Sequence, residues 1–137
     1  MEYRVCRNNP APYNDLSGKI SLLGLGTMRL PLRDAADQTS IDEEKAQEIF
    51  DYAYAHGVNY FDTAYPYHGG MSEKFCGKAL TKYPRASYHL ASKLPGWLLK
   101  CDEDVPRIFN EQLANCRTDY FDFYLAHSVH ESSWSNY

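Results

Sequence analysis

Short apolar runs alternate along the chain with longer stretches of helical periodicity. The apolar runs predict buried strands at 20–26, 58–62, 88–94 and 120–127. The stretches between them predict helices that open near Ser40, at Ser72 and near Asp102. Hairpin signals are missing between these strands, so the order β-α-β-α-β-α-β predicts a parallel sheet with helical crossovers.

The expected helix ends have recognisable signals. Ser40 with Glu43 three residues later predicts a capping box at the start of the first helix. Gly57 is suited to a left-handed position after its last turn. Ser72 is expected to cap the second helix, and Pro106 falls in the first turn of the third, where its missing N–H costs little.

The length of 137 residues suits one domain with a real core. We divide it into an irregular N-terminal segment (1–19), a region with strands one to four and three helices (20–127), and a C-terminal loop (128–137). The whole chain, 1–137, is thus expected to form a single domain.

Composition excludes several classes of protein. The chain has 14 Lys and Arg against 18 Asp and Glu, a net charge of −4, so it carries no nucleic-acid footprint. Its apolar runs are too short for a membrane span, and no basic-then-apolar leader follows Met1. Its 4 cysteines form no CxxC motif, which indicates neither a zinc knuckle nor a disulfide scaffold. We therefore expect a cytoplasmic protein with reduced thiols.

Candidate chemistry lies at the carboxyl ends of the strands, where parallel α/β folds gather their active sites. Gly26, Asp62, Lys93 and His127 each end a predicted strand. Charges at such positions are rarely buried unless paired, so we expect an Asp62–Lys93 ion pair between neighbouring strands. Alternation places 121, 123 and 125 on the same face as His127.

Tyr67 follows Asp62 on the loop over the strand ends. A nearby Lys93 ammonium would make its hydroxyl a better proton donor, and His127 could donate a hydrogen bond to a substrate oxygen. No nucleophile is evident, so a hydride cofactor would complete a carbonyl-reducing site.

Each residue also has a structural interpretation. Asp62 could be a turn or cap residue, Lys93 solvated, and Tyr67 one of 12 tyrosines used in packing. His127 and His130 suggest a metal pair only loosely, so no metal site is predicted. The run 24–27 resembles a phosphate loop but lacks its third glycine and its helix.

Together these motifs resemble the aldo-keto reductase family over about residues 18–127. The resemblance is carried by the segments 23–31, 57–67, 72–73, 77–80, 91–94 and 119–127. The Tyr-Pro-Tyr-His-Gly-Gly and Met-Arg-Leu-Pro runs are similar to the branch that often has a C-terminal iron–sulfur domain.

The resemblance implies an α/β fold, a (β/α)₈ TIM barrel of which this chain holds the N-terminal half. It implies NADPH-dependent reduction of an aldehyde or ketone, with a small-molecule carbonyl substrate. It assigns a catalytic tetrad of Tyr67, Lys93, Asp62 and His127, with Tyr67 as the proton donor. Gly26, Thr27, Met28 and Asp62 would lie along the nicotinamide ribose.

The length departs from the family, because a full barrel needs at least about 200 residues. We expect the half of the site that grips the cofactor's phosphates to be missing, together with the cysteines of an iron–sulfur cluster. Open sheet edges predict self-association. Two alternatives remain: a non-catalytic remnant that pairs with another chain, and a different barrel enzyme that uses Lys93 as a Schiff base.

Overall fold

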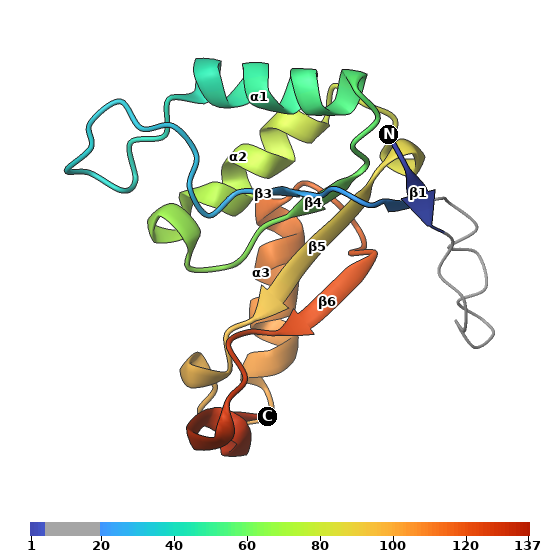
Figure 1. Cartoon of the computed structure of the whole chain (residues 1–137). Helices are drawn as coiled ribbons and strands as arrows, with labels where there is room; N and C mark the ends of the chain where they lie inside the picture. Colours follow the sequence, from blue (N-terminus) through green and yellow to red (C-terminus); the bar gives the residue numbers. More distant parts are fainter. Residues whose placement is uncertain (5–19) are drawn as a thin grey trace.

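A parallel sheet of four strands forms the centre of the molecule. The computed structural model describes residues 1–4 and 20–137. The strands are β3 (Leu25–Gly26), β4 (Tyr60–Asp62), β5 (His89–Leu94) and β6 (Phe123–Ala126). They pair in the order β3-β4-β5-β6, so each strand lies beside the next one in the chain (Figure 1). The predicted half of an α/β parallel sheet is confirmed.

Three helices connect these strands and lie on one side of the sheet (Figure 1). They are α1 (Glu43–Ala55), α2 (Met71–Leu80) and α3 (Asp104–Asn115). Within residues 1–4 and 20–137, no helix combines the length and apolarity needed to cross a bilayer. We call the side of the sheet that faces the helices the outer face, and the opposite side the inner face.

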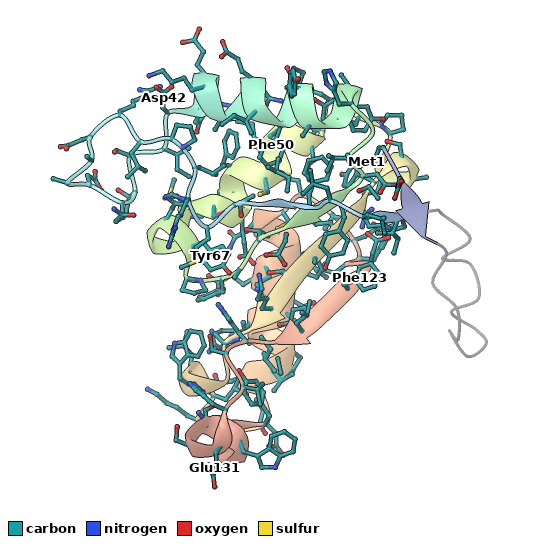
Figure 2. The ribbon with its side chains drawn as sticks, viewed as in Figure 1. Met1, Asp42, Phe50, Tyr67, Phe123 and Glu131 are labelled. Atoms are coloured by element: carbon teal, nitrogen blue, oxygen red, sulfur yellow. The ribbon has the colours of Figure 1, made fainter. Side chains whose placement is uncertain are left out.

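The hydrophobic core fills the space between the outer face and the helices. Phe50 points from α1 into this layer (Figure 2) and stacks on Phe61 of β4, with ring centroids 5.2 Å apart. Phe75 of α2 meets Phe50 edge-on at 5.4 Å. Leu90 of β5 is 1% exposed in the same cluster. These contacts account for the spacing of apolar residues on the helices.

The inner face is less deeply buried by the described residues. Tyr60 and Phe123 pack across it at 5.3 Å between ring centroids, and Leu125 is 40% exposed. β3 and β6 each have a strand neighbour on one side only within the described residues. The four predicted tetrad residues lie on this face.

The predicted first strand, 20–26, is wrong as a single element. β2 (Ile20–Ser21) pairs antiparallel with β1 (Tyr3–Arg4), and only β3 joins the parallel sheet. At the end of β2, the Ser21 N–H donates to Asn59 Oδ1 at 2.8 Å, and the Asn59 N–H donates to Ser21 Oγ at 3.1 Å. The prediction of an irregular 1–19 is wrong for β1, and its remainder, 5–19, lies outside the described residues.

Two predicted helix caps are also wrong. Asp42 caps α1 by accepting a hydrogen bond from Lys45 N–H, while the Ser40 hydroxyl bonds within the preceding turn. Gly70, at φ 87°, precedes α2, and Ser72 lies buried inside that helix. The expected ending of α1 is confirmed, because Gly57 follows it at φ 88°.

The last predicted strand and loop differ in detail. β6 begins at Phe123, and Phe121 stacks on Tyr124 at 5.8 Å and meets Phe109 of α3 at 5.7 Å. Phe121 therefore lies on the outer face, against the predicted alternation, because regular strand pairing starts only after Asp122. Residues Glu131–Asn136, expected as loop, form a 3₁₀ helix.

Candidate active site

β4 and β5 bring Asp62 and Lys93 together at their carboxyl ends. The register pairs Asp62 with Ala91, two residues before Lys93. The Lys93 ammonium lies 2.6 Å from Asp62 Oδ1 and donates to the carbonyl oxygen of Thr63 at 2.7 Å. The side chains of Lys93 and Asp62 are 12% and 27% exposed, so the pair is partly shielded from water. The expected ion pair is present.

Tyr67 begins the 3₁₀ turn Tyr67–Gly70 that follows β4 (Figure 2) and lies against this pair. The Lys93 ammonium is 4.8 Å from the centroid of the Tyr67 ring. The same ring meets the imidazole of His127 edge-on, with centroids 5.8 Å apart. The structure thus brings all four predicted tetrad residues to one edge of the inner face.

His127 follows β6 directly, and its backbone N–H donates to the carbonyl oxygen of Leu94 at 3.0 Å. Its Nδ1 is buried and has no hydrogen-bond partner among the described residues. Burial, and next the charge of Lys93, lower the pKa of His127, while Asp62 acts in the opposite direction. The imidazole is therefore neutral at pH 7 and can donate through one nitrogen.

His68 anchors the turn that carries Tyr67, a role the sequence did not reveal. Its Nε2 accepts the Leu30 N–H at 3.1 Å, and its Nδ1 lies 2.9 Å from the carbonyl oxygen of Gln38. Both nitrogens are therefore used by a neutral ring with the proton on Nδ1. His68 stands at φ 54°, which is uncommon for a residue other than glycine, directly before two glycines. That position was its one signal in the sequence.

The residues predicted along the cofactor differ in their access. Gly26 lies beside Asp62 in the sheet register, and a Cβ at Gly26 would meet no atom within 4 Å. Met28 is 60% exposed. Thr27 is fully buried, and its hydroxyl bonds to the Asp62 carbonyl oxygen at 3.0 Å and the Ser72 hydroxyl at 2.7 Å. Its backbone N–H also donates to the Asp62 carbonyl oxygen at 2.9 Å, so Thr27 has no exposed surface for a cofactor in this arrangement.

Behind Lys93, on the outer face, lies a buried polar network. Gln112 of α3 donates its side-chain amide toward Glu73 at 2.7 Å, Ser92 Oγ at 2.9 Å and the Lys93 carbonyl oxygen at 3.1 Å. The Ser92 hydroxyl also donates to Glu73, and Tyr124 donates to Gln112. Burial raises the pKa of the fully buried Glu73, although these hydrogen bonds oppose the shift. The network fixes the strand that carries Lys93.

The described residues hold no group of three or more His, Cys, Asp or Glu side chains arranged for a metal ion. His130 Nδ1 instead lies 3.1 Å from the Ser133 hydroxyl. Cys76, Cys101 and Cys116 are free thiols, and Cys6 lies outside the described residues. Burial raises the pKa of Cys76 to about 12, which makes this thiol a poor nucleophile.

Residues 22–134 match the Aldo/keto reductase family. The chain is 29% identical over 122 residues to "Probable aldo-keto reductase 1" of Glycine max, covering 83% of this chain and 34% of that protein. It is 32% identical over 117 residues to L-galactose dehydrogenase of Arabidopsis thaliana, covering 81% of this chain and 35% of the relative. The chain thus spans about a third of the length of these relatives.

Solved structures show the same similarity. The thermostable aldo-keto reductase Tm1743, in complex with epalrestat, superposes with a TM-score of 0.71 at 26% identity, over 99% of this chain and 48% of that one. An aldo-keto reductase from Klebsiella pneumoniae in complex with NADPH gives 0.65 at 27% identity, over 84% and 38%. Their barrels extend well beyond the four strands described above.

Proposed function

Because the chain belongs to the aldo/keto reductase family, we propose that it contributes the acid–base half of an NADPH-dependent site that reduces an aldehyde or ketone to an alcohol. A cytoplasmic location is part of this proposal. The observation that carries it is the arrangement of four side chains at one edge of the inner face. The Lys93–Asp62 pair and the His127 ring both lie against Tyr67.

Tyr67 donates the proton in this proposal. Its O–H bond breaks as the carbonyl oxygen becomes a hydroxyl, and solvent later restores the proton. The positive charge of Lys93, 4.8 Å from the ring centroid, stabilises the phenolate left behind. Asp62 holds the ammonium in that place through its 2.6 Å contact.

His127 orients the carbonyl group. Because the imidazole is neutral, it donates a hydrogen bond without competing with Tyr67 for the proton transfer. Its ring meets Tyr67 edge-on, so one substrate oxygen can be approached by both side chains.

The inner face fits the nicotinamide end of NADPH. The open space at Gly26 admits a ribose next to Asp62, whose carboxylate is 27% exposed and can accept a hydroxyl hydrogen bond. When bound there, NADPH would supply the hydride for the carbonyl carbon. NADPH rather than NADH rests on similarity to the reductase from Klebsiella pneumoniae solved with NADPH.

The test is a completed barrel in which residues 1–137 are joined to the second half of an aldo-keto reductase. Tyr67→Phe should lower the rate of NADPH-dependent aldehyde reduction about 10²–10⁴-fold, since general acid catalysis is lost. Tyr65→Phe is the matched control, because the Tyr65 hydroxyl bonds to Glu111 on the exposed surface. A Tyr67→Phe rate close to that of Tyr65→Phe would contradict the proposal.

The open inner face also favours a second function, a non-catalytic chain that acts by association with another chain. Leu125, on a strand with only one strand neighbour among the described residues, is 40% exposed on this face. The completed barrel separates the two: reduction that depends on Tyr67 supports the enzyme, and a completed barrel that folds but never reduces a carbonyl supports the second function.

A further inference from the structure

The C-terminal segment folds back onto the strand ends that carry Lys93 and His127. Tyr137 follows the 3₁₀ helix Glu131–Asn136. Its hydroxyl lies 2.5 Å from the carbonyl oxygen of His127 and 3.2 Å from that of Leu94, and it accepts the Gly96 N–H at 3.1 Å. One side chain thus contacts the backbone leaving β5 and the backbone leaving β6.

The ring of Tyr137 packs directly on Gly96. A Cβ at Gly96 would lie closer than 3.0 Å to three atoms of that ring. Gly96 begins the 3₁₀ helix Gly96–Leu98, in which Trp97 is the next residue. The indole of Trp97 lies 5.1 Å from the imidazole of His127, with 57° between the planes. The position of this indole therefore depends on the segment that Tyr137 contacts.

We propose that Tyr137 is a positioning residue that holds the Trp97 indole against His127 by tying the segment after β5 to the segment after β6. The hydroxyl has one hydrogen to donate to a carbonyl oxygen and accepts a second bond from Gly96. The closed arrangement keeps water from one side of the imidazole. It also places the Trp97 indole, whose residue is 48% exposed, next to the four proposed site residues.

The surroundings of His127 make the arrangement measurable. Lys93 faces it from β5, Asp62 from β4 and Tyr67 from the turn after β4. Trp97 is the fourth neighbour. A protonated imidazole quenches the fluorescence of an indole in contact with it. Emission from Trp97 against pH thus reports both the contact and the protonation of His127.

The experiment uses the whole chain in a Trp134→Phe background. The sequence has 2 tryptophans, and Trp134 is 73% exposed, so this change leaves Trp97 as the single indole at little cost. Emission should fall as the pH is lowered from about 8 to about 5, with a midpoint below the ordinary histidine pKa of about 6.5. His127→Gln should abolish the transition.

Two variants disrupt the contact of Tyr137 with the segments after β5 and β6 in different ways. Tyr137→Phe keeps the ring and removes the hydroxyl, which should lower the ratio of closed to open arrangement about tenfold. Gly96→Ala keeps the hydroxyl and displaces the ring. Both should reduce the quench and move its midpoint upward, toward the ordinary histidine value. Tyr52→Phe, which removes the hydroxyl of a 68% exposed tyrosine, should behave as the background.

A quench of full size and unchanged midpoint in both variants would overturn the proposal, as would the absence of a His127-dependent quench in the background. Two variants with a reduced quench support it. The readout needs neither cofactor nor turnover. The inference therefore stands or fails separately from the proposed carbonyl reduction.

Discussion

The outer and inner faces of the four-stranded sheet differ in how completely the described chain satisfies them. On the outer face, Phe50 and Leu90 are buried, and Glu73 receives hydrogen bonds from neighbouring side chains. On the inner face, Leu125 is 40% exposed and the buried Nδ1 of His127 has no partner among the described residues. The comparison teaches that the outer face holds the well-packed core, whereas the inner face carries the four proposed site residues and is less completely buried by the described residues.

The largest effect expected from this difference is on cofactor binding. Residues 1–137 alone should bind NADPH several orders of magnitude more weakly than a completed barrel. Under the proposed function, the described part of the inner face would contact the nicotinamide end, and we assign no described residue to the phosphates, whose charge-assisted hydrogen bonds contribute about 1.5–3 kcal/mol each.

The measurement is a titration of NADPH fluorescence with both proteins. No carbonyl reduction is expected from residues 1–137 alone. The prediction would be contradicted if residues 1–137 bound NADPH with saturation at micromolar concentration and if Asp62→Asn or Lys93→Met weakened that binding. The inner face would then bind the cofactor without the second half of a barrel.

The open inner face and free edges should next make residues 1–137 self-associate as their concentration is raised. Leu125→Lys should weaken this association, because it places a charge on edge strand β6. Leu98→Lys is the matched control, since Leu98 is also 40% exposed but lies outside the sheet. Sedimentation velocity measures the effect, and a compact monomer at all concentrations would contradict it.

A pair of identical substitutions compares the two faces directly. Phe50→Ala should lower the free energy of unfolding by about 3–5 kcal/mol, because it leaves a cavity in the closed outer layer. Phe123→Ala on the inner face should cost less than about 1.5 kcal/mol, because water already reaches this half-buried ring. Urea unfolding measures the free energy of unfolding of both variants. Equal losses in the two variants would contradict the difference between the faces.

The smallest expected effect is a pH slope set by Glu73. Burial raises its pKa above 4.5 in the fold, so the unfolded chain loses this proton at lower pH than the folded chain does. The free energy of unfolding should therefore fall as pH rises from about 4.5 through the folded pKa of Glu73. Glu73→Gln should remove that slope in urea titrations at several pH values. A slope that persists in the variant would assign it to other groups.

The alternation of strands and helices could be predicted from the sequence. Asp62, Lys93 and His127 could be placed at strand ends because strand and helix periods differ clearly. Their contact then followed from the parallel order, since parallel strands end at one edge.

The errors arose where side chains compete with the backbone. Ser40 and Asp42 are both good N-caps, and only the turn that binds the Ser40 hydroxyl decides between them. Ser21, the last residue of β2, bonds to Asn59, a residue distant in the chain. The network of Glu73 and Gln112 spans α2 and α3, so no local pattern could reveal it.

A ribosome delivers the strands of this sheet in the order in which they pair. When each strand emerges, the strand it pairs with has already been synthesised. Each pairing therefore closes a short loop and needs no contact between residues far apart in the sequence. The four proposed site residues emerge in the same order, with His127 last. This chain spans 34% of its relative from Glycine max. In a protein of that size, the four proposed site residues can come together during translation, before most of the chain has been synthesised.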